Sequence, residues 1–139
     1  MNKLLLFFCL LASTSVFSDL KSDLDNQINP LMDKVIEWRH DIHQNPELSN
    51  REYRTAKKIE AHLSSLGIKV ETKIAYTGVV GLIEGDLPGP TIALRADMDA
   101  LPVVEKTGLP FASKDKTKYL GQTVGIMHAC GHDAHVAIL

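Results

Sequence analysis

Between residues 31 and 66, hydrophobic residues recur every three or four positions, which is the spacing of an amphipathic helix. The pattern predicts a first helix over residues 31–43, because Pro30 suits the first turn of a helix and Asn45-Pro46 ends one. The polar residues 19–29 before it predict a loose lead-in. The hydrophobic stripe of this helix consists of Leu31, Val35, Trp38 and Ile42.

A second helix is predicted from about Ser49 to Leu66. Ser49 is a candidate N-cap, and Glu52 stands three places after it, which is the spacing of a capping box. Gly67 follows the last hydrophobic position and predicts the end of the helix. The stripe of this helix consists of Tyr53, Ala56, Ile59, Leu63 and Leu66.

After Gly67 the hydrophobic period changes to two, which predicts strands. Residues 68–72 alternate and predict an edge strand, and residues 78–85 predict a more hydrophobic one. Residues 91–96 are hydrophobic on both faces, as in a central strand. A short turn cluster joins the last two, so we expect them to be antiparallel neighbours.

Residues 102–123 are polar and contain several glycines and prolines, which predicts a long loop. A further helix is expected to begin at Asp133. Two helices, then strands, then a loop and a helix predict an α/β fold with a mixed sheet flanked by helices. The helix stripes and the central strand would form its core.

Residues 1–18 have the anatomy of a secretory signal. Lys3 supplies a positive head, residues 4–11 form an uncharged hydrophobic run, and small residues precede Asp19. The run is too short to span a membrane, and it lacks the amphipathic face of a buried helix. We therefore expect cleavage before Asp19, an exported protein in the periplasm or outside the cell, no membrane association afterwards, and a domain over residues 19–139.

The composition fits one globular domain, since hydrophobic residues make up 45% of the 139 residues. The formal net charge of −2 gives no electrostatic reason to expect a nucleic-acid partner. Cys9 lies in the predicted signal, so Cys130 is the single cysteine that remains after cleavage. An internal disulfide is then excluded, and Cys130 is buried, paired between molecules, a metal ligand or a nucleophile.

Two acidic residues follow the predicted central strand. Asp97 and Asp99 are two positions apart, so on extended backbone their side chains point to the same side. Adjacent carboxylates repel each other unless a cation or a donor lies between them. Arg95 or a metal ion would satisfy this need, and an ordinary acidic turn explains the spacing equally well.

The segment 128–135 concentrates side chains that bind metal ions. Cys130 and His132 flank Gly131, whose conformational freedom lets both side chains converge on one point. A thiolate and an imidazole suit zinc or another late divalent ion. Asp133 is suited to orienting an imidazole or capping the helix, and His128 and His135 are further candidates.

A thiol enzyme is the alternative for the same residues. Cys130 would be the nucleophile, with His128 or His132 as its base. Such partners usually come from distant segments rather than from sequence neighbours, which disfavours this interpretation.

Three blocks of the sequence resemble the M20 metallopeptidase family, in particular its amidohydrolase branch of hippurate hydrolases, N-acyl amino acid amidohydrolases and hydrolases of indole-acetic acid conjugates. The blocks are residues 38–49 (WRHDIHQNPELS), 94–102 (LRADMDALP) and 127–135 (MHACGHDAH), in the family's order. The third block is highly specific, and the first two are strong in its company. The resemblance covers nearly the whole chain after residue 18.

The resemblance implies an enzyme that uses two divalent metal ions, zinc or manganese with cobalt as a further candidate, to hydrolyse the amide bond of N-acyl amino acids or related conjugates. Cys130 and His132 match its first two metal-ligand positions. Asp97 and Asp99 match its acidic pair, in a supporting role. We assign His128, Asp133 and His135 to the same supporting set.

The resemblance also implies parts that this sequence does not contain. The glutamate that acts as general base, further histidine ligands, and a smaller domain that closes over the substrate and pairs subunits into a homodimer would all follow Leu139. We therefore expect the N-terminal part of a catalytic domain, inactive alone. The alternative is a truncated, non-catalytic product of such a gene.

Overall fold

The computed structural model describes residues 19–139 and divides the chain into two compact units, residues 1–36 and 37–139. The predicted signal over residues 1–18 lies outside the described residues. In the first unit, residues 19–28 are helical and the short 3-10 helix η1 (Asn29–Leu31) follows them. The expectation of a loose lead-in was therefore wrong. Lys21 and Asp25 form an ion pair one helical turn apart, which favours helix in this polar stretch.

The first predicted helix is confirmed as α2 (Met32–Gln44). Its C-terminal residues Ile42 and His43 are buried, whereas Leu31 at the start of the stripe is 54% exposed. The helix ends as expected before Pro46, and the Asn45 side chain donates to the Asp41 carbonyl at 2.8 Å.

The second predicted helix is confirmed as α3 (Tyr53–Ser65), but it begins later than the capping-box pattern indicated. Ser49 does not cap it, and the Glu52 carboxylate is buried and accepts a hydrogen bond from Thr77 Oγ1 at 2.6 Å. The Glu47 carboxylate accepts from the backbone N–H groups of Arg54 at 3.0 Å and Thr55 at 2.8 Å. Glu47 therefore satisfies donors that the first turn of a helix otherwise leaves unpaired.

The C-terminal end of α3 follows the prediction. Gly67 has φ of 75°, and Ile68 N–H donates back to the Leu63 carbonyl at 3.2 Å. The predicted stripe is correct only in part, because Tyr53 and Leu66 are 67% and 61% exposed.

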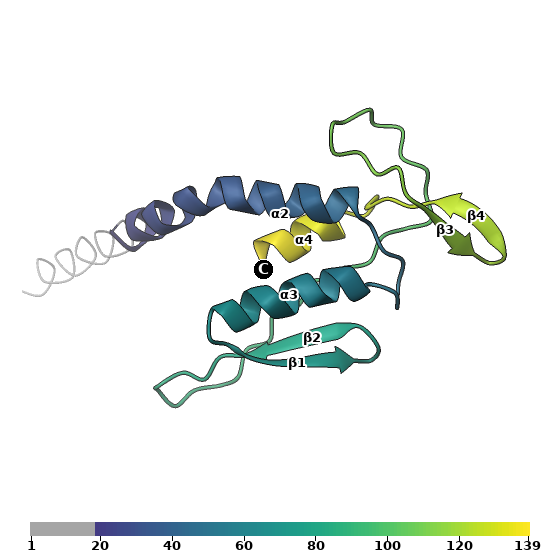
Figure 1. Ribbon diagram of the computed structural model, residues 1–139. Coiled ribbons are helices and arrows are strands. Elements are labelled where there is room, and N and C mark those ends of the chain that lie inside the picture. The colour runs from purple at the N-terminus through teal and green to yellow at the C-terminus, as the bar shows by residue number, and fades with distance from the viewer. Residues whose placement is uncertain (1–18) are drawn as a thin grey trace, which may run out of the picture. The chain divides into compact units, whose positions relative to one another are not determined.

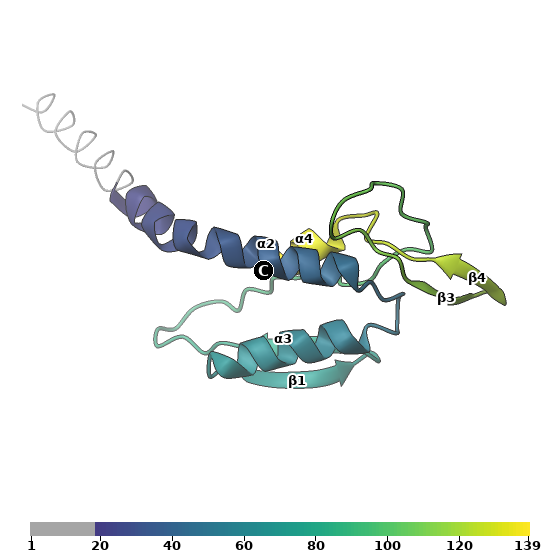
Figure 2. The same cartoon turned by 45° about the horizontal axis from the view of Figure 1, so that its top comes forward.

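The predicted strands after Gly67 are confirmed as β1 (Lys69–Ile74) and β2 (Gly78–Leu82). They form an antiparallel hairpin with Glu71 opposite Val80, and α3 lies along it (Figures 1 and 2). A Cβ at Gly81 would lie 3.2 Å from side-chain atoms of both Leu63 and Ile68, so the glycine permits the close approach of helix and hairpin.

The predicted central strand over residues 91–96 was wrong. The backbone there forms no strand, and Ile92 and Leu94 are 80% and 76% exposed. The expected pairing with residues 79–84 was also wrong, since β2 pairs with β1. A central strand needs a neighbour on each edge, and in residues 19–139 the strands form only two separate two-stranded sheets.

The predicted loop over residues 102–123 contains the start of a second hairpin, so that prediction was wrong for its last residues. Strand β3 (Lys116–Tyr119) pairs antiparallel with β4 (Gln122–Gly125). Leu120 and Gly121 between them have φ of 47° and 79°, the positive values that a tight two-residue hairpin turn requires. Strand β3 was not predicted because its sequence is polar.

Isolated bridges connect the three sequence blocks named above. Leu48 pairs in parallel with Ala100, and Leu101 pairs antiparallel with Met127. The α/β class is thus confirmed. Both strand pairs are antiparallel, the isolated Leu48–Ala100 bridge is parallel, and the strands of residues 19–139 form no single continuous sheet. Within the described residues the buried hydrophobic core is small and consists of Ile42, Leu48, Ala100, Ile126 and Ala137.

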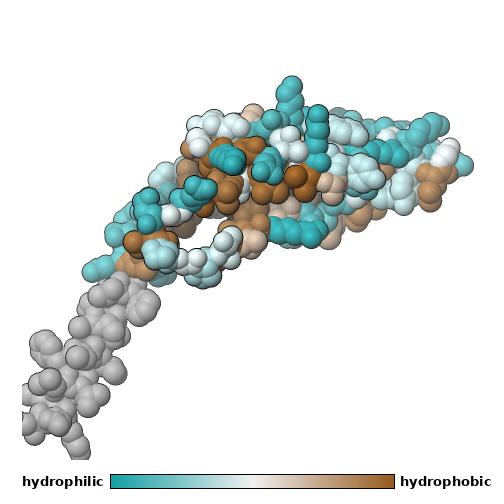
Figure 3. All heavy atoms as spheres, turned by 90° about the horizontal axis from the view of Figure 1, so that it is seen from below, coloured by the Kyte–Doolittle hydropathy of each residue, from teal (hydrophilic) through white to brown (hydrophobic). Residues whose placement is uncertain are grey.

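Many large hydrophobic side chains remain at the surface, and Figure 3 shows such residues gathered on one face. They include Val80, Leu82 and Ile83 on and after β2. Across residues 19–139, no helix combines the length and the hydrophobicity that a membrane span needs.

Candidate metal site

The predicted C-terminal helix is confirmed as α4 (His132–Ile138), and Gly131 immediately before it has φ of 89°. This left-handed conformation is the bend that the sequence predicted between Cys130 and His132. Cys130 is exposed and carries a free thiol. The His132 side chain is 16% exposed.

Asp99 holds the His132 ring. Its Oδ1 lies 2.9 Å and its backbone carbonyl 3.0 Å from His132 Nδ1, which as an N–H donates to these oxygens. With Nδ1 engaged, Nε2 is the nitrogen that remains for a ligand. A carboxylate that orients an imidazole in this way is the usual arrangement behind metal-bound histidines.

Asp97 has a different partner. The Arg95 guanidinium donates to Asp97 Oδ1 at 2.8 Å from Nε, and it lowers the pKa of this exposed carboxyl. The arginine is therefore the donor that the sequence offered for the acidic pair. The two aspartates therefore have different partners: Asp97 is paired with Arg95, and Asp99 with His132.

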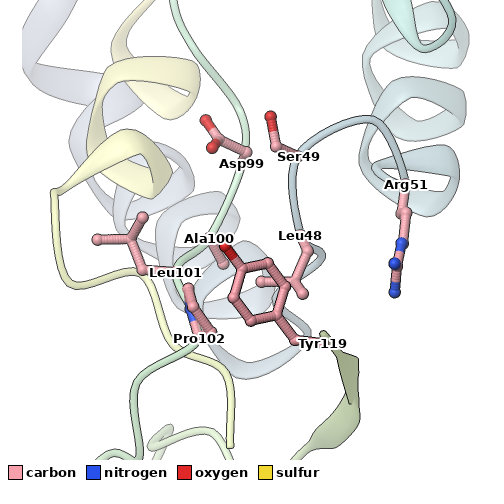
Figure 4. A pocket seen from close by; sticks show the side chains of 8 residues that line it. All are labelled: Leu48, Ser49, Arg51, Asp99, Ala100, Leu101, Pro102 and Tyr119. Atoms are coloured by element: carbon pink, nitrogen blue, oxygen red, sulfur yellow. The ribbon is translucent and has the colours of Figure 1, made fainter. Parts of the chain in front are cut away.

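A shallow pocket of about 160 Å³ adjoins Asp99. Figure 4 shows the Asp99 and Ser49 side chains pointing toward the same end of it, while the Arg51 side chain turns away. The Arg51 guanidinium donates to the Lys118 carbonyl at 2.8 Å, which ties this loop to β3.

His135 and Asp133, on the first turn of α4, differ in their surroundings. The exposed His135 ring lies 5.7 Å from the His132 ring, centroid to centroid. Asp133 is only 1% exposed, and its Oδ2 lies 2.9 Å from His43 Nδ1 and 3.3 Å from Arg39 Nε. The imidazole that Asp133 orients is thus His43 of α2 rather than a neighbour in sequence.

Burial alone would raise the pKa of Asp133. The hydrogen bond from His43 and the charge of His128 outweigh this effect and hold its pKa below the ordinary value. The carboxylate form is therefore the one that this buried environment stabilises.

The second ring nitrogen of His43 contacts Glu105. His43 Nε2 lies 3.2 Å from Glu105 Oε1, and Glu105 Oε2 accepts the backbone N–H of Ser113 at 2.6 Å. Burial would raise the pKa of Glu105, but the hydrogen bonds from Thr107, Ser113 and His43 lower it. Sequence reasoning assigned no role to His43, Arg39 or Glu105, because sequence spacing carries no signal that Arg39 and His43 contact Asp133 or that Glu105 contacts His43.

His128 is buried, at 4% exposed, and neither of its ring nitrogens has a hydrogen-bond partner among residues 19–139. Burial lowers its pKa, the charge of Asp133 opposes this, and the charge of His43 adds to the lowering. Its ring centroid lies 6.2 Å from that of His43. His128 therefore packs beside the polar cluster rather than bonding to it.

The donor chemistry at the start of α4 fits a zinc-type ion, since a free thiol and an oriented imidazole stand on either side of Gly131. In the part of the chain that the structure describes, no group of three or more His, Cys, Asp or Glu side chains is placed to hold a metal ion. The roles of Cys130 and His132 as metal ligands therefore stay predictions.

Comparisons with known proteins match this region to a hydrolase family. The model of peptidase family M20/M25/M40 matches residues 93–139. Thermostable carboxypeptidase 2 of Saccharolobus solfataricus is 50% identical over 122 residues, which are 87% of this chain and 29% of that protein. N-acetyl-L-cysteine deacetylase of Bacillus subtilis is 48% identical, over 81% of this chain and 25% of the deacetylase.

A solved structure agrees with these matches. The YXEP protein of Bacillus subtilis, described as a dinuclear metal-binding peptidase from the M20 family, is 44% identical with a TM-score of 0.68. The match covers 78% of this chain and 29% of that one. The chain therefore spans less than a third of the length of these relatives. Its residues 93–139 match the model of peptidase family M20/M25/M40, and the similarity to these relatives agrees with the resemblance of its three sequence blocks.

Proposed function

We propose that the protein containing this chain hydrolyses the amide bond of N-acyl amino acids or related conjugates with the help of two divalent metal ions. The observation that carries the proposal is the Asp99–His132 contact beside the free thiol of Cys130. It combines an oriented imidazole with a second donor of the type that zinc prefers.

Cys130 Sγ and His132 Nε2 are the atoms that would hold a metal ion. Bound divalent ions polarise a carbonyl and lower the pKa of a coordinated water, which is the chemistry that amide hydrolysis at neutral pH requires. Asp99 keeps the His132 ring in the orientation that directs Nε2 away from the carboxylate. Asp133, His43 and Arg39 fix the first turn of α4, from which His132 projects.

The relatives support the proposed substrate class. A carboxypeptidase and an N-acetyl-L-cysteine deacetylase both cleave an amide bond that has an amino acid on one side. We therefore place the proposal at the level of N-acyl amino acids and their conjugates.

The test uses the complete polypeptide that contains this sequence, loaded with zinc, manganese or cobalt. It is assayed against N-acetyl and N-benzoyl amino acids. We expect hydrolysis that a chelator abolishes and that His132→Asn reduces by at least a hundredfold. His62→Asn, at an exposed histidine of α3, is the matched control and should retain activity. Metal-independent hydrolysis would refute the proposal.

The second candidate is a truncated, non-catalytic product of such a gene. Reading the coding frame past Leu139 separates the two. A continuation with an adjacent pair of glutamates and further histidines supports the enzyme, and an immediate stop supports the non-catalytic product. Substantial turnover by the 139-residue chain alone would contradict our expectation that it is inactive.

A thiol enzyme makes a different prediction for Cys130. Bound metal should protect a ligand thiol from alkylation, whereas a nucleophilic thiol reacts quickly with metal present or absent. Alkylation of the metal-loaded complete polypeptide, followed by mass spectrometry of the peptide that contains Cys130, distinguishes the two roles.

Export is a separate proposal that rests on the sequence of residues 1–18. Their positive head, hydrophobic run and small residues before Asp19 are typical of a cleaved signal. Expression in a secretion-competent bacterium should give a mature protein that begins at Asp19. A cytosolic protein that retains Met1 would refute this proposal.

A further inference from the structure

We infer that His43, held in place by Glu105, positions the loop that carries the proposed metal ligands. This inference rests on the proposed function, because it concerns the same site. His43 is a positioning residue, since it acts through Asp133 and does not itself contact Cys130 or His132 in the contacts described.

The loop of residues 128–133 is buried at its two end residues and exposed between them. His128 and Asp133 are 4% and 1% exposed, whereas Ala129 and Cys130 between them are exposed. A loop of this kind presents its central side chains in a position that its buried ends determine. The placement of the Cys130 thiol and the His132 ring therefore depends on what holds Asp133.

Of the two side chains that contact Asp133 Oδ2, His43 makes the shorter contact. It approaches Asp133 Oδ2 at 2.9 Å from a buried position on α2, whereas the partly exposed Arg39 lies at 3.3 Å. The His43 ring also lies 6.2 Å from the His128 ring at the other end of the loop. Figures 1 and 2 both show α4 beside the C-terminal half of α2, which carries His43.

Glu105 in turn fixes His43. Its Oε1 lies 3.2 Å from His43 Nε2 and also accepts from Thr107 Oγ1, and its Oε2 accepts the Ser113 backbone N–H. A carboxylate oxygen therefore lies within hydrogen-bond distance of each nitrogen of the His43 ring. Because χ angles of a side chain bound on both sides are fixed, the ring transmits the position of segment 105–113 to the start of α4.

Two substitutions separate the two contacts of His43. In His43→Asn the side-chain amide lies near the place of Nδ1 and can still donate to Asp133, while the contact with Glu105 is lost. In His43→Gln the amide reaches toward the place of Nε2, so the contact with Glu105 is kept and the one with Asp133 is lost. A purely structural role would make both variants similarly harmful.

The first measurement is hydrogen exchange of the backbone amides in residues 128–135 of the metal-free complete polypeptide. We expect at least tenfold faster exchange in His43→Gln, which loses the contact with Asp133. We expect a smaller acceleration, of about threefold, in His43→Asn, which keeps that contact but is no longer held by Glu105. His40→Gln is the matched control, because His40 lies on the same helix but stacks on Phe111, with ring centroids 3.7 Å apart. Unchanged exchange in His43→Gln, or equal acceleration in both His43 variants, would overturn the inference.

The second measurement is Co²⁺ titration of the same proteins, followed by the absorption of the thiolate–cobalt bond. We expect the dissociation constant to rise about tenfold in His43→Gln, at the lower end of the effect of residues behind metal ligands. We expect a smaller rise in His43→Asn, which loses only the contact with Glu105, and little change in His40→Gln. Equal affinity of His43→Gln and the unmodified protein would overturn the inference. If the unmodified protein binds no Co²⁺ through its thiol, the proposed metal site fails and the positioning role fails with it, while hydrogen exchange still reports whether His43 anchors the loop.

Discussion

Asp99 Oδ1 and His132 Nδ1 lie 2.9 Å apart although 33 positions separate the two residues in sequence. The contact brings the second and third sequence blocks together at the start of α4. It also divides the acidic pair, because Asp97 is engaged by Arg95. An equal spacing in sequence thus corresponds to two different roles.

This division predicts different effects for the two aspartates. Asp99→Ala removes the carboxylate that holds the His132 ring and leaves only the backbone carbonyl as its acceptor, and we expect the metal dissociation constant of the complete polypeptide to rise about tenfold. Asp97→Ala is the matched control and should change it less than threefold, since the Asp97 carboxylate is exposed and held by Arg95. Calorimetric titration with Zn²⁺ measures both, and equal losses in the two variants would contradict the division.

A second prediction concerns the start of α3. Glu47→Ala removes the acceptor for the backbone N–H groups of Arg54 and Thr55, and we expect a loss of about 1 kcal/mol in the free energy of unfolding. Urea unfolding followed by the fluorescence of Trp38 measures this. Ser49→Ala, at the N-cap position that the sequence favoured, should cost less than about 0.5 kcal/mol. A larger loss in Ser49→Ala than in Glu47→Ala would support Ser49, rather than Glu47, as the residue that caps α3.

The case of α3 shows how far local sequence patterns determine the fold. Hydrophobic spacing located both long helices, and Gly67 marked the end of α3, because these signals depend on nearby residues alone. The N-terminal cap was missed because Glu47 reaches the helix from a preceding loop. No local sequence pattern indicates that the Glu47 side chain contacts the first turn of α3.

The strands show the same limit. Alternation located β1 and β2, but the partner of a strand is a non-local property, and residues 91–96 were given a partner that they do not have. The polar β3 was missed because it has almost no hydrophobic face.

For the candidate site, the motifs singled out Cys130, His132 and Asp99, since these residues fall in the specific blocks, and the structure brings Asp99 and His132 into contact. His43 was missed because its contact with Asp133 spans 90 positions and depends on the packing of α2 against α4. Glu105 was missed because its contact with His43 spans 62 positions. A polar residue acquires such a role only when the fold buries it.

A third prediction tests the exposed segment 91–96 in the 139-residue chain. Because Ile92 is 80% exposed, Ile92→Ser should change the free energy of unfolding by less than about 0.5 kcal/mol and should reduce aggregation. Ile42→Ala in the core is the comparison and should cost about 2–5 kcal/mol, since Ile42 is 2% exposed. Urea unfolding and sedimentation measure the two effects. A cost near that of Ile42→Ala would show that residues 91–96 are buried after all.

The last prediction concerns acid and the ion pairs between α2 and α3. Asp41 accepts from Arg54 Nη2 at 2.7 Å and from Lys58 Nζ at 2.6 Å. Partial burial would raise the pKa of Asp41, but the hydrogen bonds from Lys58 and Arg54 outweigh it, so its pKa lies below the ordinary 3.8. A carboxyl whose pKa is lowered by folding stabilises the folded state above its unfolded pKa. That stabilisation is lost as the pH falls from about 4 through the lower folded value.

At pH 7, Asp41→Asn should therefore cost about 0.5–1 kcal/mol, the range of partly exposed ion pairs. The difference from the unmodified chain should shrink below pH 4, because both then carry an uncharged side chain at position 41. Asp25→Asn removes the exposed Lys21–Asp25 pair and is the matched control, with an expected cost below about 0.5 kcal/mol. Urea unfolding at pH 7, 5, 4 and 3 measures the series. A difference that persists undiminished at pH 3 would show that Asp41 acts through its shape and hydrogen bonds rather than through its charge.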